Sequence, residues 1–271
     1  MKTWSMTGTS RGFGREWTLA ALKRGDQVAA TARHIESLDD VVAEFGDRIL
    51  SLTLDVNDRA ADFAAVKAAH DRFGRLDVIV NNAGYGLFGA IEEVNEAEAR
   101  AQIETNLFGA LWVTQAALPY LRAQGSGHIL QVSSVGGIGA FSGLGLYHAS
   151  KWGLEGFSEA LSQEVAKFGI HVTIIEPGGF TTDWGGSSSK HAAVLPAYAD
   201  IPQVRESWTA TIKYGDPAAT SQAILKVVDS EHPPLRLLLG AFGIQLVSQI
   251  YEQRLKTWAE WADVSRAADG D

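Results

Sequence analysis

The chain has 271 residues, of which 46% are hydrophobic and 20% are charged, and its formal net charge at pH 7 is −9. It contains no cysteine, which excludes a disulfide scaffold, a thiolate metal site and a cysteine nucleophile. The excess of 32 acidic over 23 basic side chains argues against non-specific binding to nucleic acid or to anionic membranes, but it allows a local basic pocket.

Short apolar segments alternate with longer segments of helical period from the N-terminus to about residue 178. The apolar segments predict strands over residues 2–7, 27–31, 49–54, 78–80, 128–133 and 171–176. Helices are predicted over residues 13–24, 36–45, 59–73, 96–123 and 150–168. Repeated βαβ order predicts a doubly wound parallel sheet with helices on both faces.

The pattern loosens beyond Pro177, and residues 183–214 show only weak periodicity. We predict a substrate lid there, with a plain surface loop as the alternative. A helix over 217–230 and a strand over 235–239 restore the alternation and bring the sheet to about seven strands, and helical spacing predicts a C-terminal helix over 242–263. We interpret residues 1–271 as a single Rossmann-like α/β domain with a C-terminal helical extension, because no linker divides them.

No targeting signal or membrane span is visible. The first residues run into glycine-rich sequence too early for a secretory signal, and the apolar runs are shorter than the roughly 20 residues of a membrane helix. We therefore expect a cytoplasmic protein.

A glycine-rich turn follows the first predicted strand. Gly8, Gly12 and Gly14 permit positive φ and close approach of the backbone to a ligand, and the helix that follows directs its free N–H groups at the same place. Ordinary βα turns also need glycine, but the strand–turn–helix context at the first crossover favours a dinucleotide phosphate site.

The end of the second predicted strand carries an arginine where an NAD-selective site would carry an acid. Arg33 and Arg11, which lies in the glycine turn, suit the forked hydrogen bonding of a 2′-phosphate. The alternative is that Arg33 merely begins a solvated helix face. We predict NADP(H) as the cofactor.

Three further segments follow predicted strands at the carboxyl edge of the sheet. Asn81-Asn82-Ala83-Gly84 follows the fourth strand and Ser133-Ser134 ends the fifth, while Tyr147 and Lys151 lie four residues apart and share one face of the next helix. A neighbouring ammonium and a cationic nicotinamide both stabilise a phenolate and bring its pKa nearer to working pH, so Tyr147 is a candidate acid–base group. Each motif alone is weak, whereas their order is not expected by chance.

Together these motifs resemble the short-chain dehydrogenase/reductase family over about residues 3–182. The resemblance implies a catalytic set of Asn106, Ser134, Tyr147 and Lys151, with Ser134 preferred to Ser133 because it lies thirteen residues before Tyr147. It also implies cofactor contacts along the same region. These are Gly8, Ser10, Arg11, Gly12, Phe13, Gly14, Arg33, Asp55, Val56, Asn82, Ala83, Gly84, Tyr147, Lys151, Pro177, Gly178 and Thr182.

The mechanism that the resemblance implies is hydride transfer between nicotinamide and a carbonyl or carbinol carbon. Tyr147 would exchange the proton on oxygen, Ser134 would polarise that oxygen, and Lys151 would hold the ribose and tune Tyr147. Asn106 would hold a relay water through its main-chain carbonyl. No metal is required.

We therefore expect an NADP(H)-dependent oxidoreductase acting on a hydrophobic ketone, aldehyde or secondary alcohol, that is, a carbonyl reductase. The alternatives are a steroid- or retinoid-type dehydrogenase of the same family and a non-catalytic NADP(H)-sensing protein. His148 should point away from Tyr147 and be structural. In the family the helices over 96–123 and 150–168 form dimers or tetramers, so a homodimer or homotetramer is expected. Candidate substrate-pocket residues are Phe141, Leu144, Trp184 and Trp208.

Overall fold

The computed structural model describes residues 1–270, apart from the side chain of Trp208. In this part of the chain a parallel sheet has the strand order β3-β2-β1-β4-β6-β7-β9. Its strands are β1 (Thr3–Met6), β2 (Gln27–Ala32), β3 (Ile49–Thr53), β4 (Val78–Asn81), β6 (Gly127–Val132), β7 (Ile170–Pro177) and β9 (Arg236–Leu239). The order reverses between β1 and β4, where open α/β sheets bind their ligands, and the predicted seven-stranded Rossmann-like class is confirmed.

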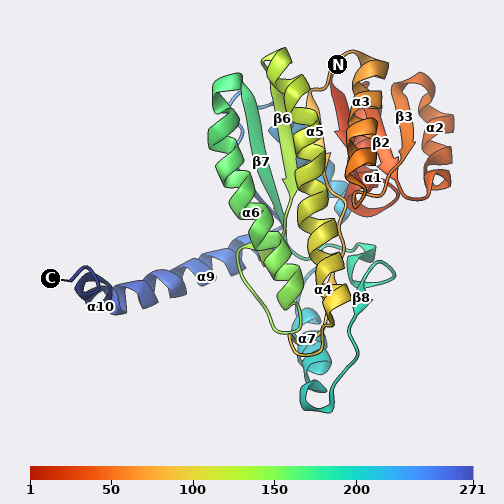
Figure 1. Cartoon of the computed structure of the whole chain (residues 1–271). Helices are drawn as coiled ribbons and strands as arrows, with labels where there is room; N and C mark the ends of the chain where they lie inside the picture. The colour runs from red at the N-terminus through yellow and green to blue at the C-terminus, as the bar shows by residue number, and fades with distance from the viewer. Residues whose placement is uncertain (271) are drawn as a thin grey trace.

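Helices cover both faces of the sheet (Figure 1). One face is covered by α1 (Gly12–Arg24), α2 (Asp39–Phe45) and α8 (Thr220–Asp229). The other is covered by α3 (Arg59–Phe73), α5 (Gly109–Gln124) and α6 (Gly145–Val165). Each face therefore has its own apolar core.

The continuously apolar strands contribute side chains to both apolar cores. In β4, Val78 and Val80 face the core beneath α1, while Ile79 between them faces the core beneath α5. Successive side chains of a strand point to opposite faces, so a strand covered on both sides is apolar at every position.

The predicted helix over 96–123 is helical throughout, but a π-helical segment divides it into two α-helices. α4 (Glu96–Ile103) leads into a π-helical segment (Glu104–Phe108), and α5 follows. The apolar period continues through the π-helical segment, so it gave no sign of the interruption.

The weakly periodic segment after β7 is partly ordered by pairing. Its β8 (Lys190–His191) pairs with β5 (Leu87–Phe88), and α7 (Ile201–Thr209) follows. Both strands have two residues, which is too short to show a hydrophobic period.

A C-terminal extension is confirmed. α9 (Ala241–Glu260) and α10 (Ala262–Ala267) project from the body of the molecule, with Gly243 and Val247 the buried residues of α9 (Figure 1). Among residues 1–270, no helix has the length and apolar character needed to cross a membrane.

Asp62 of α3 is fully buried, and neither carboxylate oxygen has a hydrogen-bond partner within the described residues. Burial, reinforced by Asp58 and Asp55, raises its pKa from 3.8 to about 8. The folded protein therefore keeps a proton that the unfolded chain releases near pH 4, and stability falls as pH rises from 4 to 8.

Asp62→Asn should raise the free energy of unfolding at pH 8 by several kcal/mol, because each unit by which folding raises the pKa of Asp62 costs about 1.4 kcal/mol there and an amide does not titrate. Denaturant unfolding of both proteins at pH 4 and pH 8 measures the difference in free energy of unfolding. The stabilisation by Asp62→Asn should vanish at pH 4. An equal gain at both pH values would contradict the proton linkage.

Candidate active site

The turn between β1 and α1 is a cradle that only glycine can form. Gly8 and Gly12 have φ of 68° and 57°. A Cβ atom on Gly14 would lie 2.3 Å from the Gly8 carbonyl oxygen. The N-cap of α1 offers no side-chain hydrogen bond and its first turn has no acidic residue, so its N–H groups suit an anion. The turn therefore fits the pyrophosphate of a dinucleotide.

The segment after β4 holds this turn in place. The Asn82 side-chain amide donates to the carbonyl oxygens of Thr7 (3.0 Å) and Gly8 (2.9 Å), and the backbone N–H groups of Asn82 and Ala83 donate to Thr7 Oγ1. Asn82 and Ala83 thus fix the cradle through hydrogen bonds within the protein.

The two arginines predicted for a 2′-phosphate differ in their surroundings. Arg33 is exposed after β2, and no carboxylate pairs with it within residues 1–270. Arg11 instead donates to Ser187 Oγ (2.9 Å) and lies 3.4 Å from Asp183 Oδ2. Arg11 therefore connects the glycine turn to the segment predicted as a lid.

The other predicted cofactor residues take different positions around the turn. The Phe13 ring stacks on Trp17 at 5.3 Å, and Ser10 is half-buried. Asp55 is exposed and accepts from the Asn57 N–H, while buried Val56 packs against Gly109.

The predicted cofactor residues at and after the end of β7 lie beside β9 and the glycine turn. The Gly178 N–H donates to the Leu239 carbonyl (2.9 Å), which places the Pro177-Gly178 segment beside β9. Thr182 lies over the glycine turn, since its Cβ would be 3.9 Å from a Cβ on Gly12.

Ser134, Tyr147 and Lys151 meet where β6 ends and α6 begins. Ser134 is half-buried, while Tyr147 and Lys151 are 5% and 6% exposed. Burial raises the pKa of Tyr147 to about 12, partly offset by a hydrogen bond with Ser134. This direction is opposite to the sequence-based expectation, because the sequence did not show how deeply the phenol is buried.

Lys151 lies beside Tyr147 on the same face of α6. Its Nζ is 6.0 Å from the centre of the Tyr147 ring and donates to the Val132 carbonyl at 2.8 Å. Burial lowers the pKa of Lys151 to about 8, although the charge of Glu155 opposes this. The ammonium is therefore close to its titration range at physiological pH.

Asn106 lies in the π-helical segment and is almost fully buried. Its side-chain oxygen accepts from the Tyr85 N–H (3.0 Å), and its amide donates to the Tyr85 carbonyl (2.9 Å) and Ser150 Oγ (3.2 Å). A Cβ on Gly84 would touch both Asn106 Oδ1 (3.1 Å) and Lys151 Nζ (3.6 Å). The hydrogen-bonding groups of the Asn106 side chain are therefore occupied by Tyr85 and Ser150. Its main chain is the part of the residue that is left for other contacts.

His148 holds the loop in front of α6, as expected of a structural residue, but its ring does not point away from Tyr147: the two ring centroids are 5.6 Å apart. Its Nε2 accepts from the Phe141 N–H (3.0 Å), so its Nδ1 carries the proton and donates to the Gly136 carbonyl (2.9 Å). His148 thereby orders the loop in front of α6.

Apolar side chains, two of them aromatic, surround the Tyr147 ring and form an apolar wall beside it. Phe88, Leu144 and Trp184 cluster with Tyr147, and the Trp184 and Tyr147 rings are 4.9 Å apart. The sequence does not predict Phe88 as a site residue, because β5, which contains it, has only two residues. Of the predicted pocket residues, Leu144 and Trp184 join this cluster, Phe141 packs against His148 at 5.3 Å, and the Trp208 side chain lies outside the described residues.

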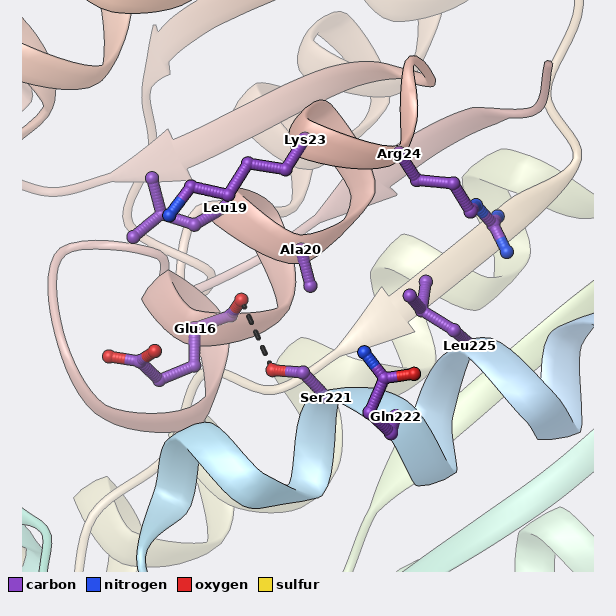
Figure 2. A pocket seen from close by; sticks show the side chains of 8 residues that line it. All are labelled: Glu16, Leu19, Ala20, Lys23, Arg24, Ser221, Gln222 and Leu225. Carbon is purple, nitrogen blue, oxygen red and sulfur yellow. Dashed lines mark hydrogen bonds between the residues drawn. The ribbon is translucent and has the colours of Figure 1, made fainter.

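Two hollows lie outside this cluster. One of about 280 Å³ lies beneath α7 and is lined by Ala90, Ile91, Glu92, Phe141, Ser142, Gly143, Gly145, Tyr198 and Ile201. The other, of about 530 Å³, lies between α1 and α8 and contains none of the candidate site residues (Figure 2). The first adjoins the loop that leads to Tyr147.

Comparisons with known proteins agree with this geometry. Residues 2–193 match the family model described as short chain dehydrogenase. Oxidoreductase BOA17 of Botryotinia fuckeliana is 42% identical over 98% of this chain and 99% of its own length.

Two solved structures extend the comparison. A short-chain dehydrogenase from Streptomyces avermitilis has a TM-score of 0.93 and 40% identity, over 99% of this chain and 100% of that one. An alcohol dehydrogenase from Thermococcus sibiricus, complexed with 5-hydroxy-NADP, has a TM-score of 0.74 and 25% identity, over 88% of this chain and 96% of that one.

Proposed function

Because the chain belongs to the short-chain dehydrogenase/reductase family of NAD(P)-dependent oxidoreductases, we propose that it is an NADP(H)-dependent carbonyl reductase. Its substrate would be a hydrophobic ketone or aldehyde, or a secondary alcohol in the reverse direction. The observation that carries the proposal is the buried Tyr147 phenol, which lies between Ser134, Lys151 and an apolar aromatic wall.

The roles of the side chains follow from their protonation and contacts. The nicotinamide, when bound, supplies or accepts the hydride. Tyr147 keeps its proton at neutral pH and is therefore ready to donate it to a carbonyl oxygen, as reduction requires. Ser134 donates to the same oxygen as negative charge develops on it, and Lys151 stabilises the phenolate that remains.

The choice of NADP(H) rests on the surroundings of Arg33. An exposed guanidinium with no acidic partner within the described residues stands at the end of β2, where selection for NAD would place a carboxylate. The Thermococcus sibiricus relative is complexed with an NADP derivative. Both observations support a 2′-phosphate site.

The substrate class rests on the wall around Tyr147. Phe88, Leu144 and Trp184 are apolar, and Trp184 packs so closely over Gly86 that a Cβ there would be 2.6 Å from its ring. Such a wall favours an aromatic or aliphatic group beside the reacting carbonyl.

A panel of aromatic ketones, aliphatic ketones and aldehydes, and secondary alcohols, assayed in both directions with NADPH/NADP⁺ and NADH/NAD⁺, tests this function. We expect NADPH oxidation with hydrophobic ketones. Tight NADPH binding without turnover of any carbonyl or alcohol would contradict an enzymatic role and favour a cofactor sensor.

Arg33→Ala should raise KM for NADPH about 10–100-fold and leave KM for NADH nearly unchanged, because a charge-assisted hydrogen bond contributes about 1.5–3 kcal/mol. Steady-state kinetics with both cofactors measures this selectivity. Arg122→Ala, which removes an exposed cation from the end of α5, is the control. Equal effects on the two cofactors would contradict the assignment of Arg33 to the 2′-phosphate.

A further inference from the structure

A cationic side chain lies against the apolar wall beside Tyr147. Arg205 of α7 is half-buried, and its guanidinium carbon lies 4.4 Å from the centre of the Phe88 ring. Phe88 belongs to the same apolar cluster as Leu144 and Tyr147. Arg205 therefore contacts the wall that the proposed substrate would meet, although it is distant from Tyr147 in sequence.

A second contact fixes the position of α7. Ile201 precedes Arg205 by one turn on the same face of the helix. It packs against the loop before α6, since a Cβ on Gly143 would lie 2.7 Å from Ile201 Cγ2. In Figure 1, α7 accordingly lies next to the end of α6 from which that loop extends. The face of α7 that carries Arg205 is thus turned towards the candidate active site.

The first acidic side chains after β5 are bonded to other groups. Glu92 accepts a hydrogen bond from the Tyr198 hydroxyl (2.6 Å), and Glu93 accepts one from a backbone N–H group of the segment before α7 (2.7 Å). The guanidinium of Arg205 forms no ion pair or hydrogen bond with the residues that the structure describes. These carboxylates therefore hold the segment that leads to α7 and do not neutralise its arginine.

The contact with Phe88 leaves the hydrogen-bonding capacity of Arg205 unused. A cation over an aromatic ring is attracted by the ring quadrupole, and this attraction occupies none of the guanidinium N–H donors. Those donors lie in one plane and match the two oxygens of a carboxylate. In a chain with 32 acidic and only 23 basic side chains, a half-buried arginine without an acidic partner indicates a site for an anion from outside the chain.

We propose that Arg205 binds a carboxylate on the substrate, so that the preferred substrate is a ketone or aldehyde whose apolar body carries a carboxylate. In this arrangement the carbonyl lies at Tyr147, the apolar body lies along Phe88 and the carboxylate lies at Arg205. This inference deepens the proposed reductase function and rests on it for turnover, whereas binding of the carboxylate requires no turnover.

A purely structural role for Arg205 predicts a different result. If its contact with Phe88 only holds α7 in place, loss of the guanidinium should lower the turnover of charged and uncharged substrates equally. The ratio of kcat/KM between a carboxylate and its uncharged amide therefore separates recognition of the substrate from support of the fold.

Steady-state kinetics with NADPH tests the proposal. The substrates are meta- and para-acetylbenzoate and the longer acetylphenylbutanoate, each compared with its amide. In the unmodified protein kcat/KM should be about 10–100-fold higher for at least one carboxylate than for its amide, which is the contribution of a charge-assisted hydrogen bond. Arg205→Met should abolish this preference, and Arg205→Lys should retain part of it, because lysine keeps the charge but lacks the planar fork.

Arg122→Met is the matched control, because it removes an exposed cation of the same type from the end of α5. It should leave the preference for the carboxylate intact. The proposal is overturned by an equal loss with carboxylates and amides in Arg205→Met, or by the absence of any preference for a carboxylate in the unmodified protein.

Binding without reaction provides an independent readout. Para-ethylbenzoate carries the carboxylate but no ketone, so calorimetric titration of the full-length protein, with and without NADP⁺, measures recognition alone. It should bind about 10–100-fold more tightly than para-ethylbenzamide to the unmodified protein, and no more tightly than the amide to Arg205→Met. Equal affinities in the unmodified protein would overturn the inference even if ketones are reduced. Absence of turnover with every carbonyl, together with Arg205-dependent binding of ethylbenzoate, would contradict only the proposed function.

Discussion

Replacement of Tyr147 by phenylalanine should lower kcat for carbonyl reduction by about 10²–10⁴-fold, the range that a positioned acid contributes. The phenol is buried, and burial holds its pKa at about 12, so in the unmodified protein nearly every molecule carries the proton that the product alkoxide needs. Phenylalanine keeps the ring that packs against Trp184 and Leu144 but has no proton to give. Initial rates of NADPH oxidation with the best ketone of the panel measure the loss.

The binding of NADPH and the melting temperature of Tyr147→Phe should remain close to those of the unmodified protein. Tyr120→Phe, which removes a phenol that stacks on His70 away from the site, controls for the loss of a hydroxyl group. Undiminished turnover in Tyr147→Phe would exclude Tyr147 as the acid.

Gly14→Ala should destabilise the fold and weaken NADPH binding, although alanine is ordinarily the better helix former. The added Cβ would lie 2.3 Å from the Gly8 carbonyl oxygen and 2.5 Å from the Asn82 amide nitrogen that anchors it. The turn must open to relieve the clash, which costs about 1–3 kcal/mol. We expect the affinity for NADPH to fall about tenfold or more, as measured by fluorescence titration.

Gly156→Ala is the matched control, because it makes the same change inside α6 at an exposed position where a Cβ meets nothing within 4 Å. It should raise the free energy of unfolding by up to ~1 kcal/mol, the difference in helix propensity. A stabilising effect of both substitutions, in denaturant unfolding, would show that the glycine turn tolerates a side chain.

Much of the fold and of the candidate site could be predicted from local patterns. The strand of continuous apolar residues around Ile79 and the four-residue spacing of Tyr147 and Lys151 depend only on residues near each other in sequence. The π-helical segment around Asn106 and the short strand containing Phe88 gave no such pattern, since the apolar period continues through the π-helical segment and a two-residue strand is too short to show a period. The homodimer or homotetramer expected from the resemblance stays a prediction.

The sequence by itself determined the alternation of strands and helices, the glycine turn and the order of Ser134, Tyr147 and Lys151, because these are properties of spacing and residue type. Only the tertiary structure decided their electrostatics. Burial raises the pKa of Tyr147 and lowers that of Lys151, and the meeting of β5, α6 and α7 brings Arg205 against the apolar wall beside Tyr147. Desolvation and charge proximity depend on which segments pack together, and that information is not local in the chain.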